Sequence, residues 1–113
     1  MLTRRPLDSP LDHLQARRAA ARRAVALQQA ESALAALGAQ GARAELVGSL
    51  ARGQFRLNSD VDFLVMEQGP LSQGQIYGII SDHLRDAAFD VIYASRMTPT
   101  GLATMLDDAK RPA

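Results

Sequence analysis

The sequence predicts one small α/β or α+β domain in which helices pack on a sheet in two layers. The chain has 113 residues, of which 47% are hydrophobic, so we expect one core and no second substrate-binding domain. The apolar spacing changes along the chain in the order helix, strand, short helix, strand, helix, strand, helix. We therefore expect residues 1–113 to form a single domain, with a basic helical segment at 1–40, a core at 43–94 and a C-terminal helix and tail at 98–113.

A long N-terminal helix is the first predicted element. Ser9 and Pro10 suit an N-cap and a first-turn position, and Asp12 favours the positive end of the helix dipole. Alanine-rich sequence follows, and Gly38 suits the C-terminal cap. One apolar stripe has the spacing of a buried helix face, at Leu27, Ala30, Leu34 and Leu37. The pattern leaves open whether one helix or two helices, broken near the double arginines, cover this stretch.

Strands and shorter helices alternate in the rest of the chain. A short helix is possible after the glycine-serine turn "GSLARG", and the turn residues between the apolar runs mark the other boundaries. The third strand is recognised by its β-branched and aromatic residues. We expect strands over Ala44–Val47, Val61–Met66 and the stretch "AFDVIYA", and helices over Gln73–Ala87 and Pro99–Asp108.

Composition excludes several kinds of site and location. Cysteine is absent, so there is no disulfide framework and no thiolate metal site. The N-terminal "MLTRRPLDSPLDHL" lacks the apolar run of a signal peptide, and no apolar stretch approaches the roughly 20 residues that span a bilayer. We therefore expect a cytoplasmic protein without a membrane partner. His13 and His83 lie in helical stretches and are interpreted as ordinary surface or boundary residues.

Basic residues are concentrated near the N-terminus, although the formal net charge of the chain is only +1. Two aspartates accompany six arginines within residues 1–30, namely Arg4, Arg5, Arg17, Arg18, Arg22 and Arg23. Such an arm can contact nucleic acid or an acidic partner. Because no aromatic residues accompany the arginines, a solvated helix face is the favoured interpretation, and nucleic-acid binding remains an alternative.

Two aspartates lie close together in "GSLARGQFRLNSDVDFLV", the stretch from Gly48 to Val65. Residues two apart on a strand share a face, so Asp60 and Asp62 are expected to point away from Val61 and Phe63. Neighbouring carboxylates repel each other, so this arrangement needs a cation or solvent. Taken alone, the pair also suits a turn or the end of a strand. Mg²⁺ takes oxygen ligands of this kind and completes its shell with waters and substrate phosphates.

A third carboxylate is available on the last predicted strand. Asp90 alternates with Phe89 and Val91, so it is expected to face away from the apolar side. If this strand lies beside the Val61–Met66 strand, three aspartates form one cluster. Two metal ions about 4 Å apart in such a cluster would clamp the attacking and leaving oxygens of a phosphoryl displacement.

The glycine-serine turn adds groups that can face a phosphate chain. It follows a strand, so its backbone N–H groups and the Ser49 hydroxyl are suited to phosphate oxygens. Glycine at position 48 allows close approach of the backbone. Arg52 can supply positive charge to the same phosphates or pair with an acidic side chain.

The sequence has Gly48-Ser49, then ten residues, then Asp60-Val61-Asp62. This pattern resembles the signature of nucleotidyltransferases of the DNA polymerase beta superfamily. The fuller string is similar to the minimal nucleotidyltransferases, or MNT proteins, in which G-S-x-A-R-G, S-D-x-D and a later strand aspartate recur. The likeness covers about 18 contiguous residues and the Asp90 strand, and it is far more specific than an isolated glycine-rich loop. It implies the nucleotidyltransferase fold, a small mixed sheet flanked by helices, with residues 43–94 as the catalytic core.

This resemblance also implies roles for individual residues. Asp60, Asp62 and Asp90 would bind Mg²⁺, with two ions expected, and Asp90 would accept the proton of the attacking hydroxyl. Contacts to the triphosphate of ATP would come from Gly48 and Ser49. Arg52 would be structural or face the phosphates, and Ser59 would position the aspartates. The implied reaction transfers a nucleoside monophosphate, AMP from ATP, to a hydroxyl with release of pyrophosphate.

A partner protein is implied as well, because minimal nucleotidyltransferases often pair with HEPN-domain proteins. In toxin–antitoxin systems of this kind the HEPN protein is an RNase toxin, which the MNT protein neutralises by adding AMP to a tyrosine. We therefore expect an AMP-transferring antitoxin in a hetero-oligomer. Two alternatives stay open: a binding subunit that silences its partner by occlusion through the long helix, and a nucleotidyltransferase acting on RNA or a small molecule.

Overall fold

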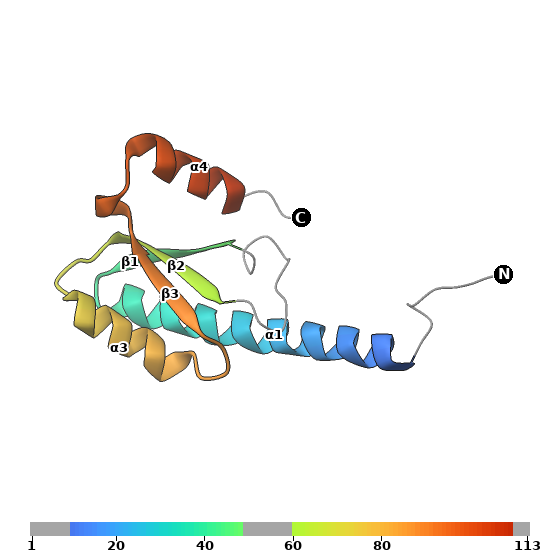
Figure 1. Cartoon of the computed structure of the whole chain (residues 1–113). Coiled ribbons are helices and arrows are strands. Elements are labelled where there is room, and N and C mark those ends of the chain that lie inside the picture. Colours follow the sequence, from blue (N-terminus) through green and yellow to red (C-terminus); the bar gives the residue numbers. More distant parts are fainter. Residues whose placement is uncertain (1–9, 49–59, 110–113) are drawn as a thin grey trace.

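The computed structural model describes residues 10–48 and 60–109, which form helices on both sides of a small sheet (Figure 1). In chain order the elements are α1 (Pro10–Ala39), β1 (Arg43–Val47), β2 (Val61–Glu67), α3 (Gln73–His83), β3 (Phe89–Tyr93), the 3₁₀ helix η2 (Ala94–Arg96) and α4 (Pro99–Ala109). The mixed sheet, the flanking helices and the long N-terminal helix confirm the predicted fold class. In the described residues, no helix is long and apolar enough to cross a membrane.

The sheet has three strands in the order β1-β2-β3, with both strand directions present. β1 pairs with β2 antiparallel, and β3 pairs with β2 parallel. The parallel pair requires a crossover, which α3 provides between the two strands. Across the sheet, Asp62 on β2 is opposite Val47 on one side and Asp90 on the other. This register places one residue from each strand in a single row.

The main core lies between the sheet and the helices α1 and α3. Val61, Phe63 and Val65 point to this side from β2 and are at most 2% exposed. Burying a side chain such as Phe63 contributes roughly 1.5–3 kcal/mol. The rings of Phe63 and Phe89 are perpendicular to each other, with the ring centroids 6.2 Å apart. Val61 and Phe63 therefore occupy the layer that strand alternation predicts.

Small residues of α1 form the face that packs on this core. Four α1 side chains are at most 1% exposed: Ala26, Ala30, Ala33 and Leu37. Leu27 and Leu34 are only partly buried at the edge of the core. Two of the four residues of the predicted stripe, Ala30 and Leu37, are therefore at the centre of the buried face, and the other two lie at its margin. The small alanine side chains let the helix approach the sheet closely.

Several predicted element ends are shifted in the structure. α1 is one continuous helix that ends at Ala39, and Gly41, at φ +92°, has the left-handed conformation expected of Gly38. The Gly41 N–H bonds to the Gly38 carbonyl, and the Ala42 N–H bonds to that of Leu37, so the helix ends two residues later than the Gly38 cap predicts. β1 begins one residue early, at Arg43, and β2 extends to Glu67. The Ser9 cap and the short helix after the glycine-serine turn lie outside the described residues.

The helix α3 also ends earlier than the sequence indicates. It stops at His83 instead of Ala87, and Leu84 follows in an extended conformation with its side chain 4% exposed. Burial of Leu84 in the core turns the chain away from the helix axis. The helix starts at Gln73, as predicted. Ser72 and Gln75 form a reciprocal capping box at this end.

Candidate active site

Asp62 and Asp90 lie side by side on the face of the sheet that is opposite the main core. They are register partners on the parallel strands β2 and β3, so their side chains leave the sheet on the same side. Asp62 is partly buried and Asp90 is exposed. Phe89 and Val91, the neighbours of Asp90, pack against the core instead. The expected orientation of Asp90 and the expected pairing of its strand with β2 are therefore confirmed.

Asp60 differs from this pair because it precedes the strand. β2 begins at Val61, and Asp60 is exposed in the coil residue before it, so strand alternation does not fix its side chain as expected. Within residues 10–48 and 60–109, no three acidic or histidine side chains form a group that could hold a metal ion. The structure thus brings together two of the three expected ligands. Ser49, Arg52 and Ser59 lie outside the described residues.

Gly48 follows β1 directly and contacts Asp62. Its φ of +77° is in the left-handed region, where side chains other than glycine are strained. A Cβ atom on Gly48 would collide with a carboxylate oxygen of Asp62. Glycine at position 48 therefore suits the left-handed backbone conformation and leaves room for the Asp62 carboxylate. The close approach to phosphates that the sequence predicts at Gly48 stays a prediction.

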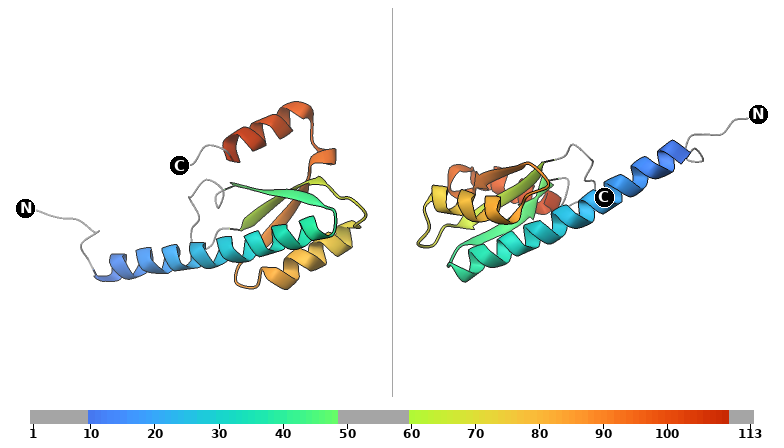
Figure 2. Two further views of the ribbon diagram at one scale, coloured as in Figure 1. Left: turned by 180° about the vertical axis from the view of Figure 1, so that it is seen from behind. Right: turned by 90° about the horizontal axis from the view of Figure 1, so that it is seen from below.

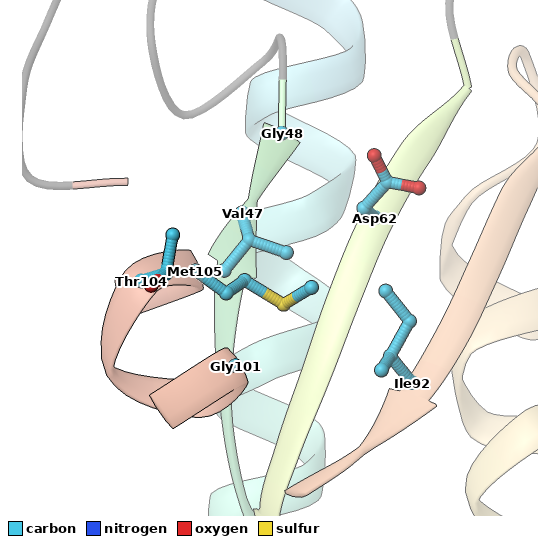
Figure 3. Close-up of a pocket in the computed structure, with 7 residues that line it drawn as sticks. All are labelled: Val47, Gly48, Asp62, Ile92, Gly101, Thr104 and Met105. Atoms are coloured by element: carbon cyan, nitrogen blue, oxygen red, sulfur yellow. The ribbon is translucent and has the colours of Figure 1, made fainter. Parts of the chain in front are cut away.

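A pocket of about 450 Å³ lies between this sheet face and α4 (Figure 3). The described residues that line it come from all three strands and from α4: Val47, Gly48, Asp62, Ile92, Gly101, Thr104 and Met105. In Figure 3, Met105 reaches from α4 toward the sheet between Val47 and Ile92, and Asp62 lies beside Gly48 at one end. Volumes of about 300–1,000 Å³ are typical of small-molecule sites.

The contribution of α4 to this pocket was not predicted from the sequence. Gly101, Thr104 and Met105 have the spacing of one helix face, which was a usable signal. The start of α4 is well defined, because the Thr98 hydroxyl accepts a 3.0 Å hydrogen bond from the Gly101 N–H. The turn through η2 after β3 determines which face of the sheet α4 covers. The spacing of residues in the sequence does not give the direction of this turn.

Val47, Asp62 and Asp90 thus form one row across the sheet, next to the left-handed Gly48. The sequence matches the nucleotidyltransferase domain family over residues 27–103. The chain belongs to this family. No curated protein matches the chain. The matched range of the nucleotidyltransferase domain contains all three strands and the pair Asp62 and Asp90.

The acidic pair of this nucleotidyltransferase domain is suited to Mg²⁺. Two adjacent carboxylates supply the hard oxygen donors that the ion prefers, and Mg²⁺ is usually held by one or two carboxylates together with substrate phosphates and waters. Without a cation, adjacent strands about 4.8 Å apart leave two like charges as near neighbours. The donor chemistry of Asp62 and Asp90 therefore fits the cofactor that the family implies.

Tyr93, at the end of β3, is on the core face of the sheet, opposite the face that carries the acidic pair. Its side chain is 8% exposed, and burial raises the pKa of its hydroxyl above the ordinary value of 10.0, while Arg96 acts in the opposite direction. The Arg96 guanidinium carbon lies 5.7 Å from the centre of the tyrosine ring. Tyr93 is therefore neutral at physiological pH and serves packing rather than proton transfer.

Proposed function

We propose that this nucleotidyltransferase domain transfers AMP from ATP to a hydroxyl group of a partner protein, as an antitoxin that modifies a HEPN RNase toxin. One observation carries the choice of reaction centre: Asp62 and Asp90 are register partners on one sheet face, with Gly48 against Asp62. Membership of the family supports nucleotide transfer. The resemblance to the minimal nucleotidyltransferases supports the protein acceptor and the HEPN partner.

In this proposal, the acidic residues hold Mg²⁺, and Asp90 also accepts the proton of the acceptor hydroxyl. Asp62, partly buried next to Gly48, holds Mg²⁺ at the nucleotide phosphates, and Asp60 joins it at the start of β2. Mg²⁺ would offset the charge that develops on the phosphate oxygens. Gly48 keeps the backbone close to the phosphate chain without displacing the Asp62 carboxylate. By the same resemblance, Ser49 contacts the triphosphate.

Asp90 acts on the acceptor because it is exposed beside Asp62. Its carboxylate accepts the proton of the attacking hydroxyl, whose oxygen forms a new bond to the α-phosphorus. The bond between the α-phosphorus and the bridging oxygen breaks, and pyrophosphate leaves. Positioning and charge compensation drive the reaction, and no covalent enzyme intermediate is needed.

The test is the intact mass of the candidate HEPN partner after incubation with this protein, ATP and Mg²⁺. A gain of one or more AMP units is expected with the native protein. The Asp60→Asn/Asp62→Asn double variant should show no gain, because it loses the carboxylates that hold Mg²⁺. An unchanged partner mass in a stable complex would overturn transfer to the partner protein and favour occlusion or a non-protein acceptor.

Substitution of Asp90 gives a second, graded prediction. Asp90→Asn should lower the transfer rate by about 10²–10⁴-fold, the usual contribution of a general base. Unfolding in metal-free buffer should be unchanged or slightly more difficult, because the repulsion from Asp62 is removed. The matched control is Asp82→Asn, which removes the same charge from an exposed position on α3. Transfer by Asp90→Asn at the rate of the control would remove Asp90 from the mechanism.

A further inference from the structure

β3 is an edge strand of the sheet and also carries one of the two aspartates of the site. Among the described strands it pairs with β2 alone. The Val61 N–H donates to the Ala88 carbonyl at 2.9 Å, so from Ala88 onward the backbone groups of every second residue are directed at β2. Those of Phe89 and Val91 are directed away from it. The sheet therefore ends at β3 in backbone donors and acceptors that can bind a further strand.

An exposed aromatic side chain lies beside this edge, on the core side of the sheet. Tyr77 is 57% exposed, more than any other large hydrophobic side chain that the structure describes. Its ring lies 4.9 Å, centre to centre, from the ring of Phe89, the first residue of β3. Figure 1 shows α3, which carries Tyr77, on the side of the sheet opposite α4. Tyrosine supplies a large contact area and is enriched at protein interfaces, so we call Tyr77 and Phe89 the aromatic platform.

A strand added next to β3 would meet different groups on its two faces. Its side chains would alternate between the side of Asp90 and the side of the aromatic platform. The row formed by Val47, Asp62 and Asp90 would continue into the added strand. Because the backbone groups of Asp90 are directed at β2, an antiparallel neighbour opposite Asp90 forms the closer kind of pair, with Cα atoms about 4.5 Å apart. A hydroxyl-bearing side chain in that row therefore lies next to the Asp90 carboxylate.

We propose that the acceptor protein binds as an extended segment that adds one strand to the sheet next to β3. The backbone of this segment bonds to Phe89 and Val91, and its acceptor hydroxyl lies on the side of Asp90. An apolar residue next to the acceptor residue packs on the aromatic platform. The inference rests on the proposed function, because Asp90 must accept the proton of the acceptor hydroxyl. The substrate class is thus an extended polypeptide segment in which a hydroxyl-bearing residue has an apolar neighbour.

The first variant blocks the edge and leaves the bonds between β2 and β3 in place. Val91→Pro removes an N–H that faces the open edge and puts a ring there, a substitution that edge strands tolerate. Val91→Ala is the matched control, because it shortens the same side chain and keeps the N–H. The measurement is kcat/KM for AMP transfer to the candidate HEPN partner. Calorimetry of Mg²⁺–ATP binding and thermal unfolding check that the nucleotide site and the fold are retained.

The second variant removes the exposed half of the aromatic platform and leaves the backbone unchanged. Tyr77→Ser deletes the ring, and Tyr77→Phe is the control that keeps it. Compared with their controls, Val91→Pro and Tyr77→Ser should each lower kcat/KM by about tenfold or more, through loss of a backbone bond and of an apolar contact. Binding of Mg²⁺–ATP should be unchanged in both. Mass spectrometry of partner peptides should find an apolar residue next to the modified residue.

Three other results would overturn the inference in distinguishable ways. If the native protein transfers AMP and both variants match their controls, the acceptor binds elsewhere and the proposed function stands. If the native protein is a dimer that Val91→Pro dissociates, a second copy of β3 occupies the edge. If the native protein binds Mg²⁺–ATP but adds no AMP to the partner, the proposed function falls together with the acceptor site.

Discussion

Gly48 and Asp62 act as one unit at the residue scale. The carboxylate occupies the space in which any other residue at position 48 would place its Cβ atom, and the left-handed backbone of Gly48 makes that space available. Gly48 follows β1 directly, and the register between β1 and β2 brings the last residue of β1, Val47, opposite Asp62. A glycine after β1 therefore determines where an acidic group on β2 can lie.

Replacement of Gly48 by alanine should affect both stability and the site. The left-handed conformation costs a residue with a Cβ atom about 1–2 kcal/mol, and the Asp62 carboxylate must also move. We expect Gly48→Ala to unfold at a lower temperature and to lose most of its transferase activity and its Mg²⁺-dependent stabilisation, as measured by thermal unfolding with and without the ion.

Gly38 provides the matched control for this substitution. It lies in the last turn of α1, and a Cβ atom there meets no other atom within 4 Å. Gly38→Ala should stabilise the protein by up to about 1 kcal/mol, because alanine loses less backbone freedom in a helix. Equal unfolding temperatures for the two variants would show that neither the conformation nor the carboxylate constrains position 48.

Strand alternation predicted the orientation of Asp90 because Phe89 and Val91 are apolar neighbours on an ordinary strand. The same reasoning was insufficient for Asp60, which lies just outside β2, where alternation no longer applies. Gly48 was predicted as a point of close approach, but its contact with Asp62 depends on the antiparallel register of β1 and β2. Register between distant strands is set by packing, and a single sequence does not show it.

At the scale of elements, one side chain of α1 holds the connection that leads into β3. The Gln29 amide oxygen accepts hydrogen bonds from the backbone N–H groups of Arg85 and Asp86, at 3.1 and 3.3 Å. Its amide nitrogen donates to the Asp86 carboxylate at 2.9 Å. Three residues further on, β3 begins and carries Asp90. Gln29 thus connects the long helix to the strand that supplies half of the acidic pair.

Removal of the Gln29 side chain should loosen the connection before β3 and destabilise the fold only slightly. Gln29→Ala leaves two backbone donors without their acceptor, and we expect a loss of about 0.5–1.5 kcal/mol in unfolding free energy. Hydrogen exchange at the amides of Arg85 and Asp86 should accelerate, and the transferase rate should fall because Asp90 is held less firmly. The control is Gln28→Ala, the same substitution at the exposed neighbouring residue. Unchanged exchange at both amides would show that Gln29 does not hold this connection.

The ends of elements show where sequence patterns stop being informative. The start of α3 was predicted correctly at Gln73, where Ser72 and Gln75 form a capping box that acts locally, within one turn. Its C-terminal end was placed at Ala87 because the sequence after His83 still favours a helix. The structure ends the helix sooner because Leu84 is buried in the core, which is a tertiary effect.

At the scale of the whole molecule, the two faces of the sheet have different tasks. One face is filled by α1 and α3 and contains the main core, and the other carries the acidic pair and is partly covered by α4 (Figure 2). No described side chain of α4 is fully buried, although Val47 and Leu64 beneath this face are at most 1% exposed. The firmly packed layer thus positions the strands, and the less buried helix leaves room for a ligand next to Asp62.

The first half of α1 projects beyond the sheet and carries the described part of the basic arm (Figures 1 and 2). Between His13 and Val25 no side chain is fully buried, and the buried face begins only at Ala26. At 3.6 residues per turn, four arginines are spread around the helix at about 0, 100, 140 and 240°. They are Arg17, Arg18, Arg22 and Arg23. Only Arg18 and Arg22, four residues apart, lie close to one line along the helix.

This distribution predicts that the arm is a poor RNA-binding surface, which bears on the alternative of an RNA acceptor. An RNA strand that follows one line along α1 meets about two of the four arginines. A plot of the logarithm of the binding constant against the logarithm of the salt concentration should then have a slope of about −1.4. An RNA strand that engages all four arginines would give a slope of about −2.8.

The measurement is fluorescence anisotropy with a single-stranded RNA oligonucleotide across a series of salt concentrations. The variant is Arg18→Gln/Arg22→Gln, and the uncharged control is Gln15→Ala/Gln28→Ala. A shallow slope that vanishes in the arginine variant is expected, because only that pair shares a line on the helix. A slope near −2.8 that the variant halves would show that the whole arm follows the strand, and it would make RNA a stronger candidate for the acceptor than a partner protein.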